Sequence, residues 1–126
     1  MQQHYTSLLN SQLWNCFCTF TSRNAMGNEG FRRMMSHLSY MIKAPEKSSI
    51  FWTTEAFKDR TGRHAHALIQ TDIPIPHIKK FCEKKYGKCT VELFDKTKNG
   101  ADYFTKDIGF TSNDYEFIGL RKNSEK

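Results

Sequence analysis

The sequence predicts an α+β domain in which helices cover one face of a central antiparallel sheet. Strand-like runs rich in aromatic and β-branched residues, at 13–22, 50–57, 63–71 and 88–94, enclose two helix-like runs and give the order βαββαβ. The run 63–71 alternates between two kinds of side chain, as a strand with one packed face does. Each helix-like run carries a single apolar stripe. Together these patterns predict one layer of helices on one sheet.

The first strand and the first helix occupy the N-terminal third of the chain. Residues 13–22 are rich in aromatic residues and threonine, which favour a strand. Asn28 can cap the helix that follows, and this helix ends before Pro45 because the residue before proline disfavours helical geometry. Its predicted buried stripe consists of Phe31, Met34, Met35, Leu38 and Ile42.

The central strands form a hairpin, and a second helix follows it. The turn-rich segment 58–62 joins the strands 50–57 and 63–71. Pro76 suits the first turn of the second helix and Gly87 lies beyond its end. Its predicted buried positions are Ile78, Phe81 and Cys82.

The last elements extend this core towards the C-terminus. The run 88–94 alternates as a fourth strand, residues 99–109 read as a short helix closed by Gly109, and residues 115–120 can supply a fifth strand. The order indicates a ferredoxin-like or RRM-like arrangement, meaning the βαββαβ sheet of ferredoxins and RNA-recognition motifs.

Length and charge describe a small domain with an anionic partner. The 126 residues form one domain, 1–126, with flexible ends expected at 1–12 and 121–126. Lysine and arginine exceed aspartate and glutamate by 19 minus 13, and this net charge of +6 favours nucleic acid. The chain is too short to include a helicase, so it works with a separate motor or is cut from a longer protein.

The four cysteines are expected to be reduced thiols that pack in apolar surroundings. Neither a secretory segment nor an apolar run of membrane-spanning length is present in the sequence, which predicts an intracellular protein. A metal site that uses the sulfurs is the alternative, but their spacings match no zinc pattern. The cysteines are Cys16, Cys18, Cys82 and Cys89.

Two histidines one residue apart are the strongest indication of chemistry. In a strand, His64 and His66 project from one face, while the small and aliphatic residues between and after them project from the other. Imidazole is the commonest transition-metal ligand, and Glu55 on the partner strand can supply a carboxylate. Such a set leaves positions open for water or substrate. The alternatives are two half-exposed histidines without a metal and a solvated glutamate.

A tyrosine and a lysine form a second candidate pair in the predicted helix 99–109. Tyr103 and Lys106 lie three residues apart and project from one face, away from the apolar stripe. A phenol becomes a useful nucleophile only when a metal or an ammonium group assists it, because its usual pKa is about 10. The alternative is a half-buried tyrosine beside a surface lysine.

These motifs, in this order and spacing, resemble the HUH endonuclease superfamily, specifically the single-tyrosine Rep initiators of rolling-circle replication. The resemblance is carried by Glu55, by His64-Ala65-His66 and by Tyr103-Phe104-Thr105-Lys106, and it spans about residues 14 to 107. Residues 18–22 occupy the place of the family's N-terminal strand motif.

The resemblance implies a metal-dependent nuclease that cuts and rejoins single-stranded DNA. His64, His66 and Glu55 would hold Mn²⁺ or Mg²⁺ at the scissile phosphate. Tyr103 would attack the phosphorus, leaving a 5′-phosphotyrosine link and a free 3′-hydroxyl, and Lys106 would assist. It would initiate rolling-circle replication at an origin, working with a separate helicase and host replication proteins in the cytoplasm or, in a eukaryotic host, the nucleus. We expect further DNA contacts from Thr21, Arg23, Arg63 and Lys98.

Two other functions are compatible with the sequence. A non-catalytic single-strand binder could use Phe20, Phe51 or Trp52 as platforms on which bases stack. A zinc hydrolase could use the histidines and the glutamate to activate water, with Tyr103 in a structural role.

Overall fold

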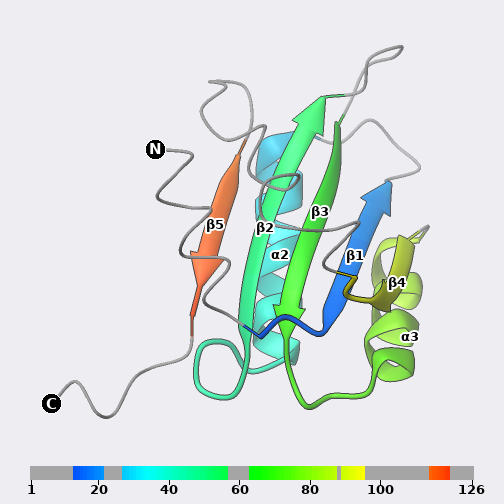
Figure 1. Cartoon of the computed structure of the whole chain (residues 1–126). Helices are drawn as coiled ribbons and strands as arrows, with labels where there is room; N and C mark the ends of the chain where they lie inside the picture. Colours follow the sequence, from blue (N-terminus) through cyan, green and yellow to red (C-terminus); the bar gives the residue numbers. More distant parts are fainter. Residues whose placement is uncertain (1–12, 22–26, 57–62, 88, 96–113, 120–126) are drawn as a thin grey trace, which may run out of the picture.

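Five strands form one antiparallel sheet in the computed structural model, in the order β4-β1-β3-β2-β5 (Figure 1). Two helices accompany the sheet in the described residues, so the α+β class predicted from the sequence is confirmed and the topology is compatible with a ferredoxin-like core. The predicted helix 99–109 and both predicted flexible ends lie outside the described residues, which are 13–21, 27–56, 63–87, 89–95 and 114–119.

The predicted elements that fall within the described residues are present, with boundaries that move by three residues at most. The strands are β1 (Cys16–Thr21), β2 (Ser49–Ala56), β3 (Arg63–Gln70), β4 (Cys89–Leu93) and β5 (Tyr115–Ile118). The helices are α2 (Asn28–Met41) and α3 (Ile75–Tyr86). Neither helix, nor any other in the described part of the chain, is long and apolar enough to cross a membrane.

The start of α2 differs from the prediction. Gly27, in extended geometry, is the N-cap, and Asn28 is the first helical residue, so the predicted capping role of Asn28 is wrong. The Asn28 Oδ1 atom instead accepts a hydrogen bond from the Thr54 hydroxyl at 2.6 Å. Local propensity predicts that the Asn28 side chain caps the helix, but in the structure this side chain is hydrogen-bonded to a residue of the distant strand β2.

The second helix follows its predicted signals closely. Pro76 lies in the first turn of α3, and Gly87 follows the helix with φ of 93°, a conformation that residues with a Cβ atom rarely adopt. Ile78 and Cys82 are fully buried as predicted, whereas Phe81 is only partly buried and packs against the edge of the core.

Alternate residues of the strands define a helix face, which α2 and α3 cover. Trp52, Ala67 and Cys18 are directly opposite or next to one another across the sheet, and all are fully buried. The predicted stripe of α2 packs against them, and the small Ala65 and Ala67 allow close approach. The buried residues of the helix face are Cys16, Cys18, Phe20, Ile50, Trp52, Thr54, Ala65, Ala67, Ile69 and Val91.

The remaining strand residues form the opposite side of the sheet, the histidine face. Its polar end carries the side chains of the three candidate metal ligands and of neighbouring threonines. Its apolar end carries Phe51 and Leu68, which are buried together with Phe17 and Trp14. The histidine face comprises Phe17, Thr19, Thr21, Phe51, Thr53, Glu55, His64, His66 and Leu68.

Ionic and aromatic contacts hold the edge strand β5 against α2. The Arg32 guanidinium donates two hydrogen bonds to the Asp114 carboxylate, at 2.9 and 2.8 Å, and lies 5.2 Å from the centre of a Trp52 ring. This forked geometry is the strongest that a guanidinium and a carboxylate can form, and the bond to Asp114 raises the pKa of Arg32.

The four cysteines, all within the described residues, are free thiols as predicted. Cys16, Cys18 and Cys82 are buried in the core beneath the helices, and Cys89 is half-buried. Burial raises the pKa of the Cys82 thiol to about 12, so this thiol remains protonated at neutral pH.

Candidate metal centre

The pairing of β2 and β3 brings Glu55 directly opposite His64. The Cα partners in this register are Glu55 and His64, and the neighbouring pair is Thr53 and His66. The Glu55 Oε1 atom lies 2.6 Å from the His64 Nε2 atom, close enough for a strong hydrogen bond. The two side chains are 25% and 21% exposed, so the pair lies at the surface and ions in solution can approach it.

His66 lies beside His64 on the same face, as the alternation predicts. The two imidazole rings are 4.9 Å apart between centres and nearly perpendicular. One nitrogen of each ring and one Glu55 oxygen all lie within 4.8 Å of one another. Two imidazoles and a carboxylate therefore converge on the histidine face, in a group that could hold one metal ion.

The chemistry of this donor set fits a divalent transition metal better than magnesium. Magnesium prefers oxygen ligands and retains several waters, whereas imidazole suits Mn²⁺ and the later transition metals. Three protein ligands leave coordination positions for water or a substrate oxygen, which is typical of catalytic sites. The group can thus hold an ion and still admit a substrate.

Strand β1 contributes contacts that the sequence did not predict. The Thr19 Oγ1 atom lies 3.3 Å from the His66 Nδ1 atom, and the Phe17 ring stacks on the His66 ring with 5.8 Å between centres and 14° between planes. Both contacts depend on the register of β1 against β3, which places Thr19 opposite His66, 47 positions later in the chain. No local pattern encodes such a register, so sequence reasoning missed them.

Two of the predicted DNA-contacting residues lie in described strands next to His64, but on different sides of the sheet. Thr21 is the partner of His64 across the β1–β3 pair, and it is half-buried on the histidine face. Arg63 begins β3 one position before His64, so by alternation it belongs to the side on which Ala65 lies. Their contacts with DNA stay predictions. The other predicted site residues, Tyr103, Lys106, Arg23 and Lys98, lie outside the described residues.

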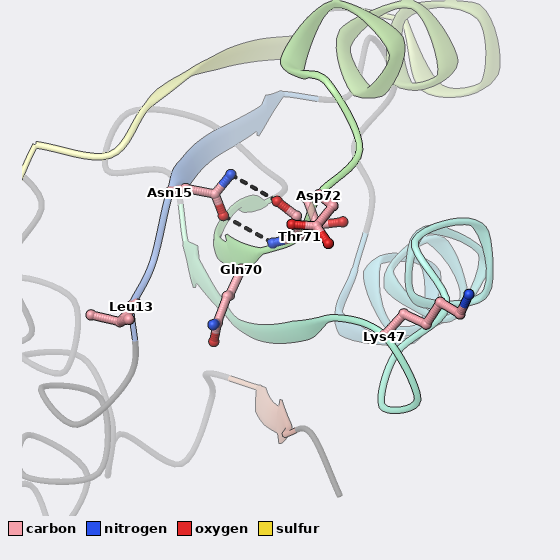
Figure 2. A pocket seen from close by; sticks show the side chains of 6 residues that line it. All are labelled: Leu13, Asn15, Lys47, Gln70, Thr71 and Asp72. Carbon is pink, nitrogen blue, oxygen red and sulfur yellow. Dashed lines mark hydrogen bonds between the residues drawn. The ribbon is translucent and has the colours of Figure 1, made fainter.

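A cavity of about 400 Å³ lies at the other end of β3, away from the three ligands. Figure 2 shows the Asn15 side chain making two hydrogen bonds with the Thr71 backbone, one to the carbonyl at 3.0 Å and one from the amide at 2.9 Å. These bonds join the residue before β1 to the residue after β3. The lining consists of Leu13, Asn15, Lys47, Gln70, Thr71 and Asp72.

The aromatic residues that a single-strand binder could use as platforms are inaccessible. Phe20, Phe51 and Trp52 are each at most 1% exposed, and Phe20 and Trp52 belong to the helix face. A base cannot stack on a ring that is already covered. This version of the binding alternative does not fit the structure.

Comparisons of the chain with family models, with curated proteins and with solved structures found no match. A functional assignment therefore depends on the donor set and on the sequence motifs.

Proposed function

We propose that this protein nicks and rejoins single-stranded DNA in a metal-dependent reaction, with Tyr103 as nucleophile, and so initiates rolling-circle replication. The observation that carries the proposal is the convergence of Glu55, His64 and His66 on the face of the sheet away from α2 and α3. In the sequence these residues are followed by the Tyr103-to-Lys106 motif, and this order is the reason for proposing Tyr103 as the nucleophile.

Glu55, His64 and His66 would hold the ion, and Mn²⁺ suits them better than Mg²⁺. A bound divalent ion supplies charge compensation at the scissile phosphate, which phosphoryl transfer requires. The three side chains are partly exposed, as a site that takes its substrate from solution requires.

In the cleavage step, the phenolic oxygen of Tyr103 forms a bond to phosphorus while the bond from phosphorus to the 3′ oxygen breaks. The phenol loses its proton and the departing oxygen ends as a 3′-hydroxyl, so the step needs no other reactant. Lys106 places an ammonium group three residues away, where it can offset negative charge on the phosphate. Because the phosphotyrosine keeps the energy of the phosphodiester, the reverse step rejoins the ends.

The test is covalent capture of DNA. The protein is incubated with MnCl₂ and a pool of labelled single-stranded oligonucleotides, and the products are resolved by denaturing electrophoresis and mass spectrometry. We expect an adduct on the peptide that contains Tyr103. Tyr103→Phe should lower adduct formation by about three orders of magnitude or more, while oligonucleotide binding stays nearly unchanged.

Tyr40→Phe is the matched control, because Tyr40 is 88% exposed on α2 and should have no role. Cleavage by Tyr103→Phe without an adduct would favour metal-activated water, the hydrolase alternative. Cleavage that persists in excess chelator would contradict the metal requirement. Binding without any cleavage would favour a binding module.

A further inference from the structure

Two strands hold the paired histidines from opposite sides. His64 is hydrogen-bonded to Glu55 from β2 at 2.6 Å, whereas His66 contacts β1 through Thr19 and Phe17. Thr19 is the direct partner of His66 across the β1–β3 pair. The donor set is therefore built on β2 and β3 but oriented in part from β1.

The Thr19 contact bears on which nitrogen of His66 can bind a metal. A neutral imidazole has one N–H group and one lone pair, so a hydrogen bond donated by one nitrogen leaves the other nitrogen as a ligand. Metal-binding histidines nearly always donate their second N–H group to a nearby acceptor. A threonine hydroxyl can be that acceptor.

We propose that Thr19 is a positioning residue whose hydroxyl accepts the Nδ1–H of His66 and so fixes Nε2 as the metal-binding nitrogen. This inference rests on the proposed metal centre but not on DNA cleavage. Phe17 restricts the plane of the His66 ring, because the two rings stack nearly parallel and this stacking limits how far the imidazole can tilt. Thr19 selects the rotation within that plane.

Threonine is suited to this role at the centre of a sheet. Its β-branched side chain is restricted in χ1, so the hydroxyl is held in one direction at little further entropic cost. Thr19 lies on β1 between β3 and β4, with His66 on one side and Thr90 on the other. Neighbours on both sides hold the backbone that carries the hydroxyl.

The chain offers a close control on the opposite side of the same histidine. Thr53 on β2 is the other cross-strand partner of His66. Its Oγ1 atom has a contact of 3.5 Å with the Thr54 carbonyl oxygen, and it belongs to the same face. Thr53→Val and Thr19→Val therefore remove the same group from either side of one ring.

The experiment combines a spectroscopic measurement with a binding measurement. The ¹⁵N chemical shifts of the His66 ring report its tautomer in the metal-free protein, and calorimetry with MnCl₂ reports metal affinity. We expect the Nδ1–H tautomer in wild type, Thr19→Ser and Thr53→Val. Thr19→Val should shift the ring towards the Nε2–H tautomer and weaken Mn²⁺ binding by about 10- to 100-fold.

The outcomes separate this inference from the proposed function. Wild-type affinity and tautomer in Thr19→Val, or an Nε2–H ring in wild type, would overturn the role of Thr19 while the metal centre stands. Failure of the wild type to bind Mn²⁺ would overturn both. Thermal unfolding of each variant verifies folding, and Thr19→Ala serves as the second hydroxyl-deleting variant if valine is poorly accommodated.

Discussion

The two faces of the sheet are made from alternate residues of the same strands, yet they differ in what they carry. The helix face is mostly apolar, and its apolar residues are buried beneath α2 and α3 together with Thr54. The histidine face is divided between an apolar end around Phe51 and Leu68 and a polar end around His64 and His66. Neighbouring residues on one strand thus contribute separately to the core and to the candidate metal centre.

This separation predicts that substitutions on the two faces have different consequences. Small side chains on the helix face allow the helices to approach, whereas the three candidate metal ligands on the histidine face are only half-buried. The apolar end is the region where the two roles meet, because it belongs to the histidine face but is buried like the core.

The largest effect should come from Phe51→Ala at the apolar end. Phe51 is fully buried beside Phe17 and Leu68, so its removal should lower the free energy of unfolding by about 3–5 kcal/mol. Phe20→Ala on the helix face should cost a similar amount, and urea denaturation measures both. A loss below about 1 kcal/mol for Phe51→Ala would show that the apolar end is not part of the core.

His66→Ala should show the opposite behaviour, although it lies only two residues from Leu68. Without metal, it should change the free energy of unfolding by less than about 1 kcal/mol, because His66 is only half-buried. Mn²⁺-dependent nicking should fall by more than about 100-fold, beyond the loss typical of residues that only orient a ligand. His37→Ala, exposed on α2, is the control, and equal activity in both variants would remove His66 from the site.

Much of this division could be predicted from the sequence. The alternation of 63–71 correctly assigns Ala65 and Ala67 to the helices and both histidines to the other face. The short turn between two strand-like runs places Glu55 near His64. These predictions succeed because hairpin pairing and side-chain alternation are local properties.

The remaining features depend on contacts between distant segments. Thr19 contacts His66 because the β1–β3 register places the two residues opposite each other. Asn28 is hydrogen-bonded to Thr54 on β2 and does not cap α2 as predicted. The burial of Phe51 on the histidine face follows from packing with Trp14 and Phe17. Tyr103 and Lys106 lie outside the described residues, so their approach to the histidines stays a prediction.

A smaller effect should come from Cys82, a buried thiol of α3 that packs against the helix face. The Cys82 pKa is raised to about 12 by burial, above its ordinary value of 9.0, so the unfolded chain loses this proton first as pH rises. Stability should therefore fall as the pH rises from about 9 to 12, and by pH 10 this group should account for a loss on the order of 1 kcal/mol. Urea denaturation at pH 8 and pH 10 measures the loss, and Cys82→Ala should reduce it. An equal loss in both proteins would contradict the assignment.

The smallest effect should come from Arg32→Ala on α2, beside the edge strand β5. The Arg32 side chain is 48% exposed, so loss of its forked bond to Asp114 should cost about 1 kcal/mol or less. Arg32→Lys keeps the charge but not the fork and should retain part of this energy. A loss above about 3 kcal/mol in chemical denaturation would mean that this pair behaves as a buried ion pair.

Mn²⁺ binding followed by electron paramagnetic resonance is the most direct test of the metal centre. The wild type should bind a single ion, and the double variant His64→Ala/His66→Ala should bind none at the same concentrations. The double variant His37→Ala/His77→Ala, which removes two exposed helix histidines, should bind as the wild type does. Equal binding by both double variants, or no binding by the wild type, would contradict a metal centre at Glu55, His64 and His66.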